Sequence, residues 1–206
     1  MNHQLRKLTG SGTAVFAVVL AACTLVNCGS AGANKSPYNK GVAAWRAKDF
    51  AEARRQWELS LAQGGSNAAF NNLGYLLYYG EGGPMDRTRA VALWLKGAAL
   101  AVSEAQFHLG TAYEEGGGVT ASRTQAYAWY TCAIATAARL SKDSAIERSI
   151  LSDAEGAIAK LGPLLTADER REGDRLAQDY ISKYSVPLSA SEQQTLVSPR
   201  RNAEAQ

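Results

Sequence analysis

Hydrophobic and polar positions follow the period of an α-helix near the end of the chain. Leu176, Tyr180 and Tyr184 lie four residues apart, so they share one face of a helix. The segment from Thr166 to Glu169 has the pattern of a capping box, which satisfies the first backbone N–H groups of a helix. We therefore expect a helix that begins after Thr166 and ends at about Tyr184.

A second helix is predicted before this one. Ser144 can cap its N-terminus, and Gly162-Pro163 stops it after about Leu161. Alanine supplies much of the 46% hydrophobic content, and only 5 prolines occur in 206 residues. Val, Ile and Thr are few, so the composition favours helices over strands. The pattern predicts an all-α fold.

The middle of the chain repeats itself with a period of 36 residues. Each copy predicts a helix, a glycine-rich loop and a second helix. Glycine commonly ends a helix, whereas Asp and Ser commonly begin one, as Asp86 and Ser122 would. A shift of 36 pairs Leu73-Gly74 with Leu109-Gly110, Gly80 with Gly116, Gly82 with Gly118, Ala90 with Ala126, Trp94 with Tyr130, and Ala99 with Ala135.

The small residues of each copy predict how its two helices pack. We expect Gly74 to let the first helix approach Ala90 closely, and Trp94 to fill the space toward the next hairpin. The second copy predicts the same arrangement. A weaker, earlier copy spans residues 38–62, where Asp49-Phe50 forms the turn.

These motifs resemble the Sel1-like repeat, a longer-looped relative of the tetratricopeptide repeat. Both copies keep most of its pattern, which runs from Leu-Gly through a glycine-rich loop to Ala, an aromatic residue and a closing pair of small residues. Leu77 stands where Tyr is usual, and Ile134 replaces the first alanine of the closing pair. The resemblance implies a right-handed solenoid of antiparallel helix hairpins, in which the two C-terminal helices cap the last repeat.

The resemblance also implies a binding surface. In tetratricopeptide arrays the first helix of each hairpin lines a concave face that holds a partner peptide or helix. Aromatic and Asn side chains suit such contacts, although the tyrosines could instead pack between hairpins. The predicted partner-binding residues are Tyr38, Trp45, Asn71, Tyr75, Tyr78, Tyr79, Phe107, Glu114 and Glu115.

The N-terminus has the pattern of an export signal. Arg6 and Lys7 precede an apolar run over residues 14–22, which is too short to cross a bilayer. Leu20-Ala21-Ala22-Cys23 resembles the lipobox of bacterial lipoproteins. That resemblance implies cleavage before Cys23 and a diacylglycerol on its thiol, and Thr24 after it implies sorting to an outer membrane facing the periplasm.

Two other interpretations of this segment stay open. Cys28 follows Asn27, which fits a lipobox poorly, and residues 31–33 could be an ordinary signal-peptidase site. A plain secreted protein whose signal contains a cysteine is the remaining alternative.

Few residues point to chemistry. The net charge of +3 comes without any basic block, so we expect no nucleic-acid binding. His108 has no ligand-type residue at metal-binding spacing, and we expect it at the surface or an edge. Cys132 lies on a predicted packed helix, where a thiol is unreactive. Glu114 and Glu115 are adjacent on a helix, so they do not face each other as an acid–base pair. We expect no catalytic residue, metal or cofactor.

The function predicted from the sequence is a non-catalytic, lipid-anchored interaction scaffold of the bacterial cell envelope that binds a protein partner. Alternatives are a cell-wall or β-lactam hydrolase, whose relatives carry cysteine pairs that this chain lacks, and a structural spacer. The expected organisation is a signal peptide over 1–22, a flexible tether over 23–36, a tetratricopeptide-like repeat over 37–65, Sel1-like repeats over 66–102 and 103–139, capping helices over 140–185 and a disordered tail over 186–206.

Overall fold

The structure is a computed structural model that describes residues 36–140 and 144–186. The predicted signal peptide, the lipidated Cys23 and almost all of the tether lie outside these residues, as does the predicted tail beyond Val186. Everything below concerns the described part of the chain.

The described residues form eight α-helices and one short 3-10 helix, without a β-strand, so the all-α prediction is confirmed. None of these helices is long and apolar enough to cross a membrane. The helices are α2 (Pro37–Arg46), α3 (Phe50–Ala62), α4 (Ala68–Tyr79), α5 (Arg87–Ala99), α6 (Ser103–Glu115), α7 (Arg123–Leu140), α8 (Ala145–Leu161), η1 (Gly162–Leu164) and α9 (Ala167–Tyr184).

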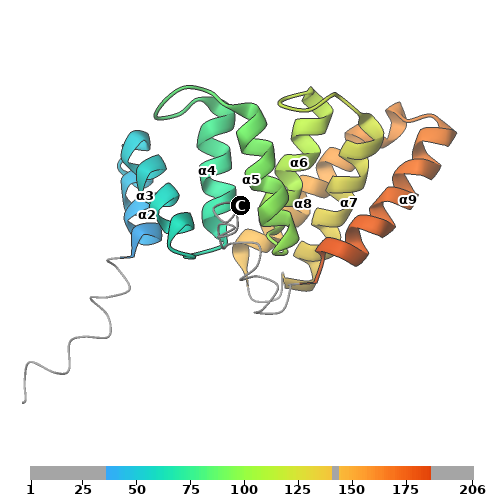
Figure 1. Cartoon of the computed structure of the whole chain (residues 1–206). Helices are drawn as coiled ribbons and strands as arrows, with labels where there is room; N and C mark the ends of the chain where they lie inside the picture. The colour runs from blue at the N-terminus through green and yellow to red at the C-terminus, as the bar shows by residue number, and fades with distance from the viewer. Residues whose placement is uncertain (1–35, 141–143, 187–206) are drawn as a thin grey trace, which may run out of the picture. The chain divides into compact units, whose positions relative to one another are not determined.

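Consecutive helices pair into hairpins that stack side by side. The pairs α2/α3, α4/α5 and α6/α7 follow one another in Figure 1, and each hairpin packs on the next through α3 against α4 and α5 against α6. Helix α8 packs on α7 and also reaches α6, whereas α9 packs on α7 and touches α5. This is the solenoid that the repeat pattern predicts.

The helix ends lie where the local sequence places them. Asp49, Asp86 and Ser144 each accept a hydrogen bond from the backbone N–H three residues later. Thr166 and Glu169 form the predicted capping box at the start of α9. These side chains satisfy backbone N–H groups that have no partner inside the helix. The loop after α4 turns at Gly80, which has a φ of 75°, a conformation that glycine adopts without steric cost.

The glycine of each first helix lies directly beneath an aromatic ring of the second helix. A Cβ built on Gly74 would lie 2.5 Å from Nε1 of Trp94, and one on Gly110 would lie 2.5 Å from the Tyr130 ring. The Trp94 ring also stacks on His108 of the next hairpin at 4.9 Å, so the prediction that it fills the space toward that hairpin holds for Trp94. The Tyr130 hydroxyl instead contacts Thr111 and Glu114 of its own hairpin. Because the aromatic side chain is longer than that of Ala90, it reaches across its own hairpin and covers the glycine.

The C-terminal helix covers the exposed side of the last repeat. Trp129 of α7 is buried and stacks on Tyr180 and Tyr184 of α9, with ring centroids 4.4 and 5.3 Å apart. Gln106 donates a hydrogen bond of 2.9 Å to the backbone carbonyl of Tyr184. The predicted apolar face of α9 thus buries an aromatic residue that would otherwise face water.

A groove lined by the first helices

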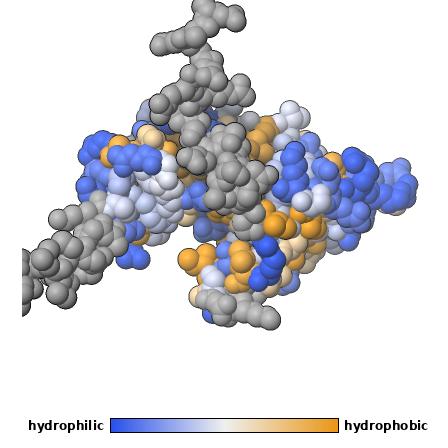
Figure 2. Space-filling model, turned by 60° about the horizontal axis from the view of Figure 1, so that its bottom comes forward, coloured by the Kyte–Doolittle hydropathy of each residue, from blue (hydrophilic) through white to orange (hydrophobic). Residues whose placement is uncertain are grey.

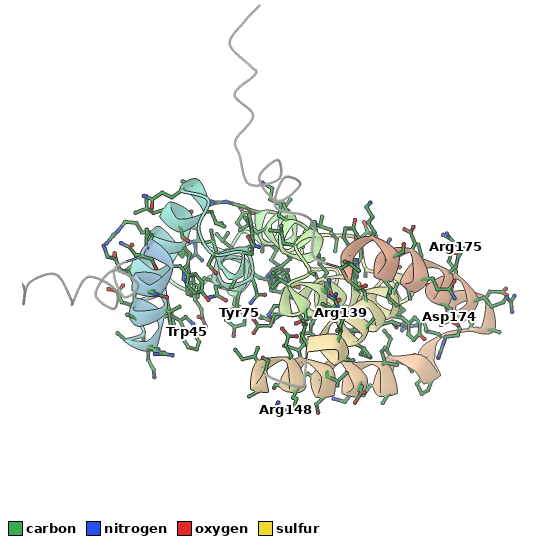
Figure 3. All side chains as sticks on the ribbon, turned by 90° about the horizontal axis from the view of Figure 1, so that it is seen from below. Trp45, Tyr75, Arg139, Arg148, Asp174 and Arg175 are labelled. Carbon is green, nitrogen blue, oxygen red and sulfur yellow. The ribbon has the colours of Figure 1, made fainter. Side chains whose placement is uncertain are left out.

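The first helices of the three hairpins line a groove that α8 closes from the other side. The groove is a cavity of about 760 Å³ with walls from α2, α4, α6 and the N-terminal half of α8. Figure 3 shows Trp45 on α2 and Tyr75 on α4, with α8 running along the edge of the stack. Helices that are far apart in the sequence therefore contribute to one surface.

Five of the nine predicted partner-binding residues line this groove together, namely Tyr38, Trp45, Asn71, Tyr75 and Phe107. Trp45 is 46% exposed, which is unusual for so large an apolar side chain. Figure 2 shows hydrophobic surface gathered near the middle of one face, with hydrophilic surface at both ends of the stack. Exposed aromatic surface in a concave setting is typical of binding sites.

The other four predicted residues lie outside the groove. Tyr78 is fully buried, and its ring packs at a tilt against Trp94 with centroids 5.0 Å apart. It donates a hydrogen bond of 2.8 Å to Glu115, so its assignment to the binding surface is wrong. Glu114 accepts a 2.7 Å hydrogen bond from Tyr130. Tyr79 is 46% exposed but packs beside Tyr75 beyond the lining residues. Tyr75 and Tyr79 are one helical turn apart on the same side of α4, whereas Tyr78 faces the core, and of the three only Tyr75 lines the groove.

The burial of Tyr78 has electrostatic consequences. Desolvation raises the pKa of its hydroxyl well above the usual range, and the hydrogen bond to Glu115 adds to the increase. Tyr130 behaves in the same way: burial raises its pKa, and its bond to Glu114 contributes in the same direction. Both tyrosines are therefore neutral donors that hold a carboxylate in place and link neighbouring helices.

The floor of the groove is polar. Asn71 is only 3% exposed, and its Nδ2 donates to Glu104 Oε2 at 3.0 Å and to Asn72 Oδ1 at 3.3 Å. Burial raises the pKa of Glu104, with a further contribution from the nearby charge of Glu147. The predicted Asn71 side chain is thus held in the groove by a carboxylate from the next repeat.

His108 also lines the groove, which the sequence did not indicate. It stacks on Trp94 with a centroid distance of 4.9 Å and contacts Tyr75 at 5.8 Å. Burial lowers the pKa of its imidazole to about 4, so His108 is neutral near pH 7. The prediction of a surface or edge histidine is therefore wrong. The 36-residue shift pairs His108 with Asn72, which also lines the groove. This pairing is the feature of the sequence that could have placed His108 in the groove.

Helix α8 contributes a wall that the repeat pattern does not contain. Ile146, Ser149, Ile150 and Asp153 line the groove from this helix, and Ile146 is 63% exposed. Ser103 at the start of α6 donates a hydrogen bond to Glu147, which holds the beginning of α8 near the groove. The repeats fade before this helix, so their register gave no information about where it packs.

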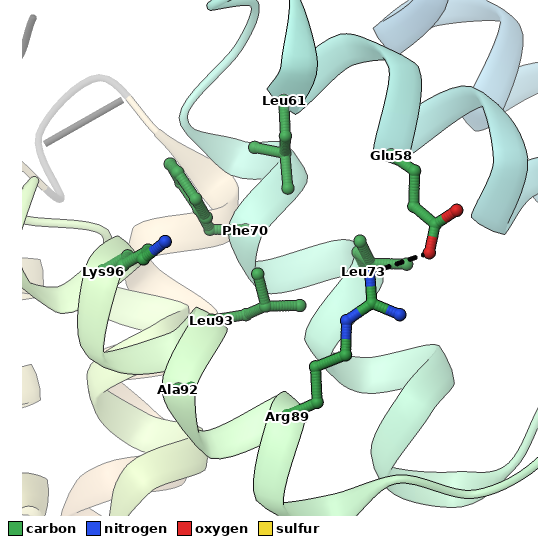
Figure 4. Close-up of a pocket in the computed structure, with 8 residues that line it drawn as sticks. All are labelled: Glu58, Leu61, Phe70, Leu73, Arg89, Ala92, Leu93 and Lys96. Atoms are coloured by element: carbon green, nitrogen blue, oxygen red, sulfur yellow. Dashed lines mark hydrogen bonds and ion pairs between the residues drawn. The ribbon is translucent and has the colours of Figure 1, made fainter. Parts of the chain in front are cut away.

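A second cavity lies among α3, α4 and α5 and shares no residue with the groove. It measures about 490 Å³ and has walls of Leu61, Phe70 and Leu93, as Figure 4 shows. An ion pair of 2.9 Å between Arg89 and Glu58 crosses its edge. Both side chains of this pair are about half exposed, so solvent screens it and it contributes little to stability.

The described residues offer little for catalysis. No group of three or more His, Cys, Asp or Glu side chains in them could hold a metal ion. Cys132 is fully buried, and desolvation raises its pKa to about 12. A thiol with so high a pKa is protonated near pH 7 and is a poor nucleophile.

Comparison with known proteins agrees with this geometry. The model of the Sel1 repeat matches residues 68–102 and 103–135, which are α4 with α5 and α6 with most of α7. No curated protein matches the chain.

One similar solved structure is a protective antigen of uropathogenic Escherichia coli that displays an SLR fold. It shares 24% sequence identity with the chain, with a TM-score of 0.58. The match covers 85% of this chain and 36% of the other, so the chain spans about a third of that protein's length. Together these comparisons show that the chain is a helical solenoid with an SLR fold that contains two Sel1 repeats.

Proposed function

We propose that this protein is a non-catalytic adaptor that is anchored by lipid in the bacterial cell envelope and binds a partner protein in the groove. Sel1 repeats generally mediate protein–protein interactions. The observation that carries the proposal is the convergence of Trp45, Tyr75 and Phe107 from three hairpins on one cavity. Large aromatic side chains in such cavities commonly supply much of the binding energy of an interface.

The groove has dimensions and chemistry that suit a peptide segment. Its cavity of about 760 Å³ has lining residues on five helices, with Trp57 of α3 among them, and sites of this size enclose a drug-sized molecule. Exposed apolar groups at Trp45 and Ile146 lie at its edges, whereas Asn71 supplies a polar group at its floor. A partner can therefore bury apolar side chains and still find a hydrogen-bond partner.

The test is crosslinking in cells followed by mass spectrometry. A photoreactive amino acid in place of Val42, which lines the groove, is expected to capture one dominant partner. Tyr75→Ala should reduce that capture about tenfold, because large interface aromatics contribute about 1–3 kcal/mol. Tyr79→Ala is the matched control, since Tyr79 is the neighbouring exposed tyrosine outside the groove. Equal loss in both variants, or no loss in either, would sink the groove assignment.

The lipid anchor is proposed from the lipobox-like segment that ends at Cys23. Cells grown with radioactive palmitate should incorporate label into the protein, and Cys23→Ser should abolish this. Cys28→Ser is the matched control and should keep the label. Fractionation of the two membranes should place the labelled protein in the outer one, because Thr24 is not an aspartate. Label that survives in Cys23→Ser but disappears in Cys28→Ser would move the anchor to Cys28.

A further inference from the structure

One end of the groove is rich in hydrogen-bond acceptors. Asn71 is 3% exposed and donates to Glu104, yet its Oδ1 atom has no hydrogen-bond partner within the described part of the chain. A buried acceptor that lacks a partner loses the hydrogen bond that it would make with water and so destabilises the folded protein. The unpaired Asn71 Oδ1 would be stabilised if a bound molecule supplied an N–H or O–H donor to it.

The charges around this acceptor are mostly negative. Glu104 accepts a hydrogen bond of 3.0 Å from Asn71. Asp153 lines the facing wall on α8, and Glu147 on the same helix raises the pKa of Glu104 by repulsion. Arg46 on α2 also lines the groove. The groove is therefore lined by carboxylates from two helices, Glu104 on α6 and Asp153 on α8, and by the guanidinium of Arg46 on α2.

Aromatic rings complete this end of the groove. Tyr75, Phe107 and the neutral His108 line it, and the His108 ring contacts both of the others at 5.8 and 5.7 Å. The faces of such rings attract cations, and the attraction is stronger where water is excluded. Carboxylates and aromatic faces are thus combined on one surface.

We propose that the acceptor end of the groove, formed by Asn71, Glu104 and Asp153, binds the cationic side chain of an arginine or lysine in a partner protein. This inference rests on the proposed function and names the chemistry of its partner. A basic side chain supplies several N–H donors and a positive charge. An acidic side chain would be repelled by Glu104 and Asp153, and an apolar one would leave the Asn71 acceptor unpaired. The apolar parts of the same segment would contact Trp45 and Ile146.

The raised pKa of Glu104 makes the binding dependent on pH. A bound cation favours the ionised carboxylate, so binding must weaken as pH falls through the pKa of Glu104. The charged group that acts on Glu104 is Glu147 on α8, while His108 is already neutral and does not titrate until about pH 4. Acidification therefore removes negative charge from this end of the groove before His108 becomes positive.

The experiment selects peptides without a prior choice of sequence. A random dodecapeptide library displayed on phage is selected on the full-length protein, and bound phage are tested again on the Tyr75→Ala variant. Peptides that depend on Tyr75 are expected to contain Arg or Lys beside apolar or aromatic residues. The best peptide is then synthesised with a fluorescent label, together with a copy in which the basic residue is Gln.

Fluorescence anisotropy measures how each peptide binds the protein and its variants. Loss of the basic residue should weaken binding to the wild type about tenfold, or about 1.4 kcal/mol, because the carboxylate would lose the cation that it pairs with. On Glu104→Gln the two peptides should differ less than twofold. Glu155→Gln removes a carboxylate from α8 outside the groove and should leave the full difference. Binding to the wild type should also weaken as the pH is lowered, because protonation of Glu104 removes its charge, and this pH dependence should be absent in Glu104→Gln.

Other results would overturn the inference. Peptides that need Tyr75 but lack a basic residue, or that carry an acidic one, would leave the groove as a binding site and remove the cationic anchor. Failure to select any peptide that depends on Tyr75 would count against the proposed function as well. If Tyr75→Ala instead changes the mass of the protein in analytical ultracentrifugation, a second copy occupies the groove and the inference is wrong.

Discussion

Three glycines set the distance between paired helices. Gly41, Gly74 and Gly110 each lie beneath an aromatic ring, and a Cβ on any of them would approach that ring to 2.4–2.5 Å. The Trp94 indole also donates a 3.2 Å hydrogen bond to the backbone carbonyl of Asn71. The Trp94 ring cannot move away from Gly74 without breaking this hydrogen bond. Gly74 therefore allows the close packing of the hairpin and also helps to position Asn71 in the groove.

Gly74→Ala is therefore expected to destabilise the protein, although alanine is normally the better helix residue. The forced displacement of Trp94 should cost about 1–3 kcal/mol, as overpacking of a core does. The control is Gly156→Ala on α8, where a Cβ would meet no atom within 4 Å. That change should stabilise by about 0.5–1 kcal/mol through helix propensity. Urea denaturation of both variants checks the opposite signs, and destabilisation by both would contradict the explanation.

The partly buried His108 makes stability depend on pH. Its pKa is about 4 in the folded protein and about 6.5 in an unfolded chain. Between these values the unfolded chain binds a proton that the folded protein does not, so stability falls as pH decreases from 7 to 4. The full effect is about 3 kcal/mol, because each pKa unit corresponds to about 1.4 kcal/mol.

His108→Gln should remove this part of the pH dependence. The variant loses the contact with Trp94 and is expected to be less stable at pH 7, but its stability should fall less between pH 7 and pH 4. The difference between wild type and variant isolates His108, since Glu104 titrates in both proteins. Free energies of unfolding at several pH values provide the measurement. Parallel pH profiles would show that His108 has an ordinary pKa.

Arg54 links the α2/α3 hairpin to the α4/α5 hairpin. From α3 its guanidinium donates to the carbonyls of Leu76 at 2.7 Å and Glu81 at 2.6 Å, which lie at and beyond the end of α4, and to Pro84 at 3.0 Å. Burial lowers the pKa of Arg54 from its usual value, although the group remains charged. A cation at a helix C-terminus also interacts favourably with the helix dipole.

Arg54→Met is expected to destabilise the protein by about 2–3 kcal/mol. Hydrogen bonds from a charged group contribute about 1.5–3 kcal/mol, and the carbonyls of Leu76 and Glu81 would lose the donor that Arg54 supplies. Arg55→Met on the next position is the control. Arg55 is 72% exposed and pairs only with Glu52 on its own helix, so its loss should change stability by less than about 0.5 kcal/mol. Thermal unfolding of the two variants would contradict this account if the melting temperatures fell equally.

The helices themselves could be predicted because their signals are local. Asp86, Ser144 and Thr166 each cap a helix within three residues, and Gly80 ends one in a left-handed conformation. Such contacts involve neighbours in the chain, so a single sequence contains them. The repeat period also allowed the stacking of the hairpins to be predicted, because equivalent residues 36 positions apart occupy equivalent places in successive hairpins.

The groove was predicted only in part because it depends on contacts between distant segments. Tyr75 and Tyr78 differ by three positions, yet one lines the cavity and the other is buried against Trp94. Which of them turns inward depends on the neighbouring hairpin, where Glu115 accepts the Tyr78 hydroxyl. The wall from Ile146 to Asp153 follows no repeat, so its position depends on how α8 packs against α6 and α7. Periodicity within one helix carries neither piece of information.

Stability should be unequal along the whole stack because each helix contacts mainly its neighbours. Helix α2 packs chiefly on α3, whereas α7 packs on α6, α8 and α9. In solenoids the stability of each repeat is roughly its own plus that of its interfaces. The hairpin of α2 and α3 has one neighbouring hairpin and should open most easily, while α7 should open last. The groove is lined by α2 and also by α6 and α8, which pack on α7, so a bound partner would join the least stable hairpin to more stable helices.

Hydrogen exchange monitored by mass spectrometry tests this gradient. Peptides from α2 and α3 should exchange at free energies well below those from α7 in the unbound protein. Gly41→Ala, which places a Cβ 2.4 Å from the Trp57 indole, should speed exchange in α2 and α3 and leave α7 unchanged. A groove-binding peptide should slow exchange in α2, α4, α6 and the first half of α8, but not in α9. Uniform exchange along the chain, or a response of α7 to Gly41→Ala, would mean that the stack unfolds as a single cooperative unit.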